Sequence, residues 1–541
     1  MNNNTPHSIQ LDGSTITADD IAAIAHHGTL VTISDVARKK AESCFEILLA
    51  AAQNGHKIYG FTVGVGWNKD KTYIDAKGTL SDELINASID FNKGLIRAHA
   101  GSVGEILPIN SVRAILAVRL NMLLTGSAGI QPAYLDVYAE MLNKNIIPVV
   151  PSKGSIGQAD VAVLGHIALC FIGEGSVHYN GQIMPSKQAF ALADIPIIEP
   201  YGKDALAMVS TNAVSLGLAS LAIVKLKQLV AMQQLIFSLS LEALNGNVSP
   251  LLADNVKQKG FSTGKQIAKT IRTYLSGSYL WQNSDSRELQ DPLSFRDAHW
   301  TISTLQEALE RAEQKLHIQL NHGDDNPTVS LGGSAITQQY GDCNEVQKRY
   351  VSDKGALFVS GNADPITWLL DFEYMTIALA HNANAACQRI IKLNTPQFTN
   401  LPRFLGSDNT YHAFGAMEKV FVSLAREIQL LANPASVTTT TIAGMIEDVA
   451  SNAPLAITRL HTAIDNYAYI LGMELIHSAQ AIDWRLRENK SLTLGKDTKI
   501  LYDAFREHVH FLDSDKSLSG DFECSARFVQ QFTLPTKTCT K

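Results

Sequence analysis

The segment from Leu206 to Leu244 constrains the fold more than any other part of the sequence. It contains no proline, and apolar residues dominate it. Lysines and glutamines, among them Lys225, Gln228 and Gln233, interrupt every window long enough to cross a bilayer. We therefore expect one long core helix in a globular protein and not a membrane span.

Further segments have the periodicity of amphipathic helices. In residues 301–320, apolar side chains recur at spacings of three and four, and charged residues occupy other positions. The ranges 365–393, 411–431 and 453–485 are similar, and each follows a break rich in glycine, proline or asparagine. The sequence therefore predicts a mainly α fold with a central bundle of long helices.

The N-terminal part of the chain is richer in loops. Residues 59–73, YGFTVGVGWNKDKTY, contain three glycines and few helix formers, which is typical of a loop that approaches a ligand. Residues 145–157 predict a buried, non-helical passage that leads into a helix near Asp160. The predicted organisation is a loop-rich active-site region (1–200), a central helical bundle (201–490) and a C-terminal subregion (491–541).

Composition and charge argue against several classes of partner. The chain has 541 residues, of which 45% are hydrophobic, and 45 basic against 52 acidic residues give a net charge of -7. No block of basic residues offers a counter-charge to nucleic acid or to anionic lipid, so we expect neither as a partner.

Cysteine usage and the N-terminal sequence favour a reducing compartment. The N-terminus has no basic segment followed by an apolar one, so we expect a cytoplasmic location and not secretion. The six cysteines include no C-x-x-C pair, which favours buried free thiols over a disulfide framework or a zinc site.

A series of short motifs, spread from about Tyr59 to Asp448, carries a further signal. The motifs are YGFTVGVG, GLIRAHAGSVGE, PVVPSKGSIG, QDPLSFRDAHW, GDDNPTV, SGNADP, LLANPASV and IEDVAS. In this order they resemble the motifs of the aromatic amino acid lyases, the superfamily of histidine, phenylalanine and tyrosine ammonia-lyases. The resemblance implies an ammonia-lyase-like fold, a homotetramer and a carbon-nitrogen lyase that acts on a small amino acid or betaine.

The resemblance also implies a prosthetic group that this sequence does not supply. In the family, an internal Ala-Ser-Gly cyclises and loses water to give a methylidene-imidazolone, an electrophile that accepts the substrate amine. Alignment on GSIG puts Gln158, Ala159 and Asp160 at the tripeptide, and alignment on Asp160 and His166 puts Gly157, Gln158 and Ala159 there. Neither choice contains a serine to dehydrate, so we expect no methylidene-imidazolone, no other cofactor and no metal.

Two interpretations of that loss stay open. One is a non-catalytic relative that keeps the fold for binding or as a scaffold, and the other is a lyase whose substrate needs no electrophile. A quaternary ammonium departs as a neutral amine and has no lone pair with which to attack an electrophile. Within the superfamily, ergothionase removes trimethylamine from ergothioneine without that group. We therefore prefer elimination from a betaine such as ergothioneine or hercynine, with ordinary histidine or aromatic amino acid ammonia-lyase activity as the rival.

The resemblance assigns roles to three residues. Tyr59 matches the tyrosine that removes the β-proton, a task that requires the pKa of a phenol to fall from about 10 towards neutrality. Arg296 matches the arginine that pairs with the substrate carboxylate, for which a planar fork of donors is suited. Glu447 matches the glutamate near the amine, where a carboxylate attracts a cation. The alternatives are a packed loop tyrosine, a structural ion pair and a buried structural glutamate.

Five further positions are predicted to contact the substrate. They are His99, Ser210, Asn326, Asn362 and Asp364. His99 is equally compatible with a core histidine, and the two asparagines with caps of backbone groups. Departures from the family pattern surround the same predicted pocket: Leu293 replaces a tyrosine, Ser210 an asparagine, Ala363 and Asp364 a Phe-His pair, and Ile446 a glutamine. The new carboxylate at Asp364 favours a larger or more cationic substrate.

Overall fold

The computed structural model describes residues 8–74, 81–332, 344–352, 354–438 and 441–535. Helices predominate among them, which confirms the predicted mainly α class. The chain divides into two compact units, and each unit combines three segments of the sequence. Unit 1 comprises Met1–Val224, Glu313–Leu370 and Pro434–Thr458, and unit 2 comprises Lys225–Ala312, Asp371–Asn433 and Arg459–Lys541. The three predicted regions, with boundaries near residues 200 and 490, stay a prediction.

The helices of the N-terminal part are short or of medium length. In chain order they are α1 (Ala18–His27), α2 (Asp35–Gln53), α3 (Asp82–His99), α4 (Ile109–Leu123), α5 (Ala133–Asn143), α6 (Val161–Phe171), α7 (Ser186–Leu192) and α8 (Asp204–Val209). The longest helices are α9 (Ala213–Leu244), α13 (Ala298–Leu320), α16 (Ile366–Leu393) and α19 (Ala453–Glu488). The remaining helices are α10 (Ala253–Val256), α11 (Ser262–Tyr274), α12 (Leu293–Arg296), α15 (Asn344–Gln347), α17 (Pro396–Thr399), α18 (Glu418–Leu431), α20 (Lys496–Arg506) and α21 (Ser519–Gln531).

The strands that the structure describes are short and belong to unit 1. They are β1 (Ser8–Leu11), β2 (Leu30–Ile33), β3 (Val103–Ile106), β4 (Ile147–Pro148), β5 (Pro151–Lys153), β6 (Ser176–Tyr179), β7 (Gln182–Pro185), β8 (Thr328–Leu331), β9 (Tyr350–Ser352) and β10 (Gly355–Phe358). Strands β1 and β2 pair in parallel, and β10 lies between β8 and β9 with antiparallel pairing to both. The pairs β3–β5 and β4–β6–β7 complete the set.

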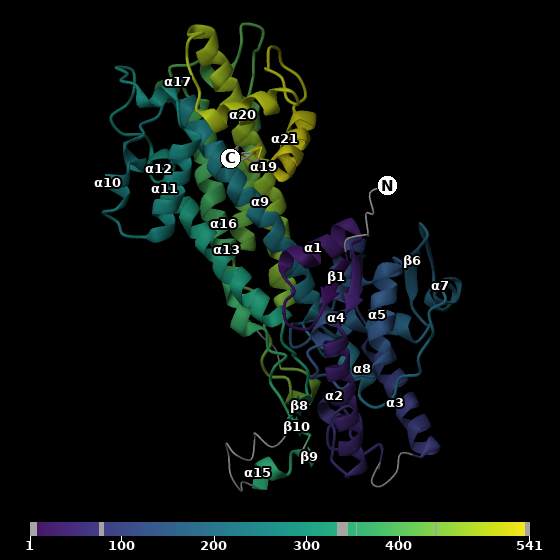
Figure 1. Ribbon diagram of the computed structural model, residues 1–541. Coiled ribbons are helices and arrows are strands. Elements are labelled where there is room, and N and C mark those ends of the chain that lie inside the picture. The colour runs from purple at the N-terminus through teal and green to yellow at the C-terminus, as the bar shows by residue number, and fades with distance from the viewer. Residues whose placement is uncertain (1–7, 75–80, 333–343, 353, 439–440, 536–541) are drawn as a thin grey trace, which may run out of the picture. The chain divides into compact units, whose positions relative to one another are not determined.

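In unit 2 the long helices α9, α13, α16 and α19 run side by side (Figure 1). Hydrogen bonds between buried polar groups connect these helices, in addition to apolar contacts. Gln233 of α9 donates its Nε2 hydrogen to Asn382 Oδ1 of α16 at 2.6 Å, and Asn382 donates to the Thr301 carbonyl of α13 at 3.0 Å. Ser240 of α9 donates to the Glu474 carboxylate of α19 at 2.8 Å. The helices are therefore held in one register by hydrogen bonds that apolar packing alone would not specify.

The long apolar segment is interrupted, so the prediction of one helix from 206 to 244 is wrong in its details. The helix stops at Val209 and restarts at Ala213. The carboxylate of Asp324 causes the break, because it accepts the Thr211 hydroxyl at 2.9 Å and the Asn212 backbone N–H at 2.7 Å. These hydrogen bonds to the carboxylate take the place of bonds to helix carbonyls. The carboxylate also lies at the N-terminus of α9, the positive end of the helix dipole.

The predicted helix at 411–431 begins later, at Glu418. The carboxylate of Asp515 accepts the backbone N–H groups of Tyr411 and Ala413 at 2.8 and 2.9 Å, and that of His412 at 3.1 Å. A carboxylate that collects consecutive N–H groups stabilises a turn in preference to a helix. The other long predictions agree with α13, α16 and α19 to within a few residues, and α6 follows Asp160 as expected.

One apolar stretch, Asp204–Leu244, has the length and composition of a membrane span, and 89% of its most apolar window is buried inside the fold. This burial agrees with the core segment that the sequence predicts. Among the described residues, Cys44, Cys170 and Cys387 are buried free thiols, as predicted, whereas the free thiol Cys524 is only partly buried. Cys343 and Cys539, and the first residues of the chain, lie outside the described residues, and the cytoplasmic location stays a prediction.

The buried ion pair between Arg389 and Glu474 provides a test of the bundle. Both side chains are almost fully buried, with Nε–Oε1 at 2.5 Å and Nη2–Oε2 at 2.8 Å. Arg389→Met strands the carboxylate in the core, so we expect a loss of about 3–5 kcal/mol and a clearly lower thermal midpoint. The double variant Arg389→Met/Glu474→Leu should recover most of the lost stability, because no unpaired charge is then left in the core.

The control is the exposed pair of Lys225 and Asp465 in the same unit. Lys225→Met should cost at most about 1 kcal/mol. Equal effects of Arg389→Met and Lys225→Met would contradict the role given to the buried pair.

Candidate active site

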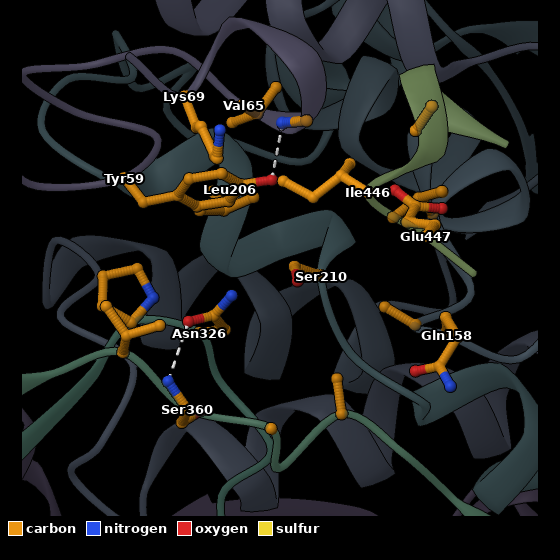
Figure 2. A pocket seen from close by; sticks show the side chains of 18 of the residues that line it. Tyr59, Val65, Lys69, Gln158, Leu206, Ser210, Asn326, Ser360, Ile446 and Glu447 are labelled. Atoms are coloured by element: carbon orange, nitrogen blue, oxygen red, sulfur yellow. Dashed lines mark hydrogen bonds between the residues drawn. The ribbon is translucent and has the colours of Figure 1, made fainter. Parts of the chain in front are cut away.

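A cavity of about 890 Å³ opens in unit 1 where several loops converge (Figure 2). The loops come after α2, before α6, between α8 and α9, before β8, after β10 and before α19. Of the predicted site residues, the cavity lining includes Tyr59, His99, Ser210, Asn326, Asp364 and Glu447. Residues from six separate parts of the sequence thus meet at one cavity, as a binding site requires.

The loop that carries Tyr59 is anchored in the core on both sides of that residue. Ile58 and Phe61 are fully buried and pack with Phe45 and Leu48 of α2. Between these two anchors Tyr59 is only partly buried, and it lines the cavity. The two buried neighbours therefore fix the backbone and leave the phenol facing the cavity.

The oxygen of Tyr59 has a defined hydrogen-bond donor. The backbone N–H of Gly66 donates to Tyr59 Oη at 2.7 Å (Figure 2). Burial raises the pKa of Tyr59, the Gly66 N–H opposes that rise, and the negative charge of Glu447 adds to it. In the free protein the phenol is therefore protonated at neutral pH, and work as a base requires more positive charge nearby than the protein alone supplies.

Asn326 and Ser360 form the opposite wall (Figure 2). The Ser360 backbone N–H donates to Asn326 Oδ1 at 3.0 Å, and the Ser360 hydroxyl donates to the Asp325 carbonyl at 2.6 Å. Lys203 Nζ donates to the carbonyl of Pro327 at 2.9 Å. The amide nitrogen of Asn326 is thereby left to face a ligand.

Four buried charges lie behind this wall. Arg119 Nη2 is 2.8 Å from Asp325 Oδ1, and Arg119 Nη1 is 3.5 Å from Asp324 Oδ1. Lys203 Nζ is 3.9 Å from Asp325 Oδ1, and all four side chains are almost fully buried. Burial raises the pKa of Asp324 to about 6, although the guanidinium of Arg119 lowers it. The positive charges of Arg119 and Lys203 thus balance the two carboxylates, which makes burial of these four side chains possible.

The break between α8 and α9 places Ser210 at the cavity. Within the break, the Asp324 carboxylate accepts hydrogen bonds from Thr211 and Asn212. The side-chain amide of Asn212 in turn donates to the carbonyl of Ala363, on the loop after β10, at 2.6 Å. Ala363 and its neighbour Asp364 also line the cavity. The same buried carboxylate therefore supports two parts of the wall.

The segment that the family uses for its electrophile borders the cavity. Gln158 and Ala159 are among the lining residues, and Ala159 has a left-handed backbone with φ of 60°. The next residue, Asp160, is fully buried, and its carboxylate accepts the Ser215 backbone N–H at 2.8 Å. Burial raises the pKa of Asp160 to about 7.

These residues do not fit a methylidene-imidazolone. Its formation needs a serine whose hydroxyl is lost as water, and residues 157–160 are Gly, Gln, Ala and Asp. The serine nearest to this segment in the sequence, Ser155, accepts the Val163 backbone N–H at 3.4 Å at the start of α6. Its flanking residues are Gly154 and Ile156, which is not the Ala-Ser-Gly arrangement.

Three other predicted residues have clear local roles. His99 ends α3, and its Nδ1 lies 2.8 Å from the Leu95 carbonyl, an acceptor to which Nδ1 donates. Asp364 accepts the backbone N–H of Ile366 at 3.0 Å at the start of α16. Glu447 closes a small loop, since its carbonyl accepts the Ile442 N–H at 2.9 Å.

Two predicted residues are not among those that line the cavity. Asn362 is exposed on the loop after β10, although its neighbours Gly361 and Ala363 do line the cavity. Arg296 ends α12 in unit 2, where its Nη1 donates to Gln290 Oε1 and its Nε lies 3.8 Å from Asp297. The contact of Arg296 with a substrate stays a prediction.

Several residues that line the cavity are not among those predicted from the sequence. Ser360 lies at the start of the SGNADP motif, and its place in a motif was the available signal. Lys57 lies two positions before the YGFTVGVG motif, and Lys69 belongs to the same loop. The fourth, Arg349, lies between α15 and β9, and none of the motifs includes it.

The comparisons with known proteins agree with the motif order. The family model for aromatic amino acid lyase matches residues 16–507. The chain belongs to the aromatic amino acid lyase family. It is a carbon-nitrogen lyase by this membership. It is also similar to histidine ammonia-lyase from Streptococcus gordonii, with 29% identity over 95% of this chain and 93% of that protein.

Two solved structures have the same fold over nearly the whole chain. Ergothionase from Treponema denticola, an ergothioneine-degrading enzyme in complex with desmethyl-ergothioneine sulfonic acid, is 36% identical, with a TM-score of 0.85. The match covers 97% of this chain and 98% of that one. Tyrosine aminomutase from Streptomyces globisporus is 25% identical, with a TM-score of 0.85 and 97% of each chain covered. The predicted ammonia-lyase-like fold is therefore confirmed.

Proposed function

We propose that this lyase eliminates trimethylamine from a histidine-derived betaine, with ergothioneine as the preferred substrate, and that it does so without a methylidene-imidazolone. The segment Gly157–Asp160 carries the proposal, because it borders the cavity and offers no serine from which the electrophile is made. The similarity to ergothionase, at 36% identity against 29% for the histidine ammonia-lyase, supports the same substrate class.

A quaternary ammonium makes the electrophile unnecessary. The base removes the proton from the β-carbon, the C–H electron pair forms the Cα=Cβ bond, and the Cα–N pair leaves with nitrogen. The products are an α,β-unsaturated acid, neutral trimethylamine and a protonated base, so charge and atoms balance. A primary amine leaves far less readily, which is the difficulty that the electrophile removes in the rest of the family.

We assign the base to Tyr59 and the cation site to Glu447. A trimethylammonium bound beside Glu447 would offset the negative charge that raises the pKa of Tyr59. The Gly66 N–H then stabilises the phenolate through a charge-assisted hydrogen bond. The substrate thus supplies the positive charge that Tyr59 requires to work as a base.

The remaining predicted residues complete the proposal. Asp364 adds a second carboxylate to the cavity lining, and His99, Ser210 and Asn326 offer polar groups to the ring and carboxylate of the substrate. Arg296 and Asn362 keep the substrate-binding roles predicted from the motifs. A homotetramer, typical of the family, is part of the proposal.

Turnover of a substrate panel tests the proposed function. We expect wild-type protein to release trimethylamine from ergothioneine, and more slowly from hercynine, with an ultraviolet band from the conjugated product. Histidine, phenylalanine and tyrosine should give no ammonia. Release of ammonia from histidine at a comparable rate would favour ordinary histidine ammonia-lyase, and binding of betaines without any release would favour a scaffold.

The intact mass of the active protein tests the absence of the electrophile. We expect the mass to equal that of the sequence, because no serine lies at the tripeptide position to lose water. Treatment with borohydride should leave activity unchanged, since there is no electrophile to reduce. A peptide covering residues 154–160 that is lighter by one water would contradict this part of the proposal.

Tyr59→Phe tests the base. The variant keeps the ring and removes the oxygen, so substrate binding and folding should persist while turnover falls by roughly 10²–10⁴. Wild-type kcat/KM should rise with pH, because the base works as the phenolate, and Tyr59→Phe should lose that rise. Tyr73→Phe, at an exposed tyrosine of the same loop outside the cavity lining, is the matched control. Full activity in Tyr59→Phe would reject the assignment.

A further inference from the structure

Trp67 is an unusually exposed aromatic residue on the loop that carries Tyr59. It lies in a single 3-10 turn, Gly66–Asn68, and 66% of its surface is exposed. We call residues 58–74 the tyrosine loop. Hydrogen bonds within the loop hold its shape, including Gly64 N–H to the Lys71 carbonyl at 3.1 Å and Tyr73 N–H to the Thr62 carbonyl at 3.0 Å.

The indole of Trp67 covers a glycine of the segment that carries Glu447. We call residues 441–450 the glutamate loop, and it contains a second short turn, Ala443–Met445. Gly444 has a left-handed backbone, with φ of 65°. A Cβ atom at Gly444 would lie 2.1 Å from Trp67 Cε3 and 2.5 Å from Cδ2, so only glycine lets the ring approach this closely.

Each partner in this contact is close to a group with a proposed role in the reaction. On the tyrosine loop, Gly66 directly precedes Trp67 and donates its N–H to Tyr59 Oη. On the glutamate loop, the Ile442 N–H donates to the Glu447 carbonyl and closes the turn that contains Gly444. A shift of the indole would therefore move the donor to the base, and a shift of Gly444 would move the carboxylate.

We propose that the stacking of Trp67 on Gly444, which we call the clasp, holds the two loops together and sets the separation between Tyr59 and Glu447. Trp67 and Gly444 are then positioning residues. The proposal rests on the proposed function for the roles of Tyr59 and Glu447. It predicts that the clasp contributes to the rate of elimination much more than to substrate affinity, because the clasped loops align the base with the leaving group.

Variants of Trp67 test the rate effect on the substrate that the wild-type protein converts. Trp67→Ala should lower kcat by about ten- to hundredfold, the range expected when reacting groups are misplaced by an ångström. KM and the thermal midpoint should change little, and Trp67→Phe should restore most of the rate by keeping a ring over the glycine. In the background of Tyr59→Phe, Trp67→Ala should have no further effect.

Gly444→Ala tests the other side of the clasp. We expect the same loss of kcat, because the new methyl group pushes the indole away. Gly28→Ala is the matched control: its φ of 64° imposes the same backbone strain, and its Cβ would meet nothing within 4 Å. A loss confined to Gly444→Ala separates the collision with Trp67 from the strain.

Hydrogen–deuterium exchange tests the clasp without any substrate. Trp67→Ala should speed exchange at residues 442–449 by at least about threefold, as expected when a tertiary contact of a loop is lost. Faster exchange in a protein that releases no amine from any betaine would leave the clasp standing and reject the proposed function. Unchanged exchange at 442–449, or an unchanged kcat in Trp67→Ala when the wild type is active, would overturn the clasp.

Discussion

The buried carboxylate of Asp324 is the interaction on which the candidate site depends. It accepts the Thr211 hydroxyl and the Asn212 N–H and lies 3.5 Å from Arg119. By taking those two donors it interrupts an apolar helix that would otherwise continue, and the interruption exposes Ser210 to the cavity. A charge in the core is costly unless it is paired and hydrogen-bonded, and here both conditions are met.

The same carboxylate organises parts of the cavity wall that are far apart in the sequence. Asn212, held by Asp324, reaches the carbonyl of Ala363, and the Thr211 carbonyl accepts the N–H of Asp160 at 2.8 Å. Asp160 in turn caps the start of α9 through Ser215. The segment that borders the cavity at Gln158 is therefore fixed by hydrogen bonds to the start of α9, which gives this part of the site a rigid frame.

The sequence predicted the long helices well and their interruptions poorly. Periodicity is a local property, so it located α13, α16 and α19, but the break at 211–212 depends on Asp324, more than a hundred residues away. Tyr59, Asn326 and Glu447 were predicted as site residues from the motifs, and all three line one cavity. The resemblance to a family carries tertiary information that periodicity lacks. The contact between Trp67 and Gly444 could not be predicted, since it joins two irregular loops whose approach no local pattern encodes.

In the proposed reaction, the charge on the leaving group replaces the electrophile. The most direct measurement compares kcat/KM for ergothioneine with that for the same 2-thiohistidine bearing a primary amine, by detecting trimethylamine and ammonia with one protein preparation. We predict elimination from the trimethylated compound and none from the primary amine, although both share ring and carboxylate. Comparable rates for the two compounds would contradict the claim, because the protein would then activate a poor leaving group by other means.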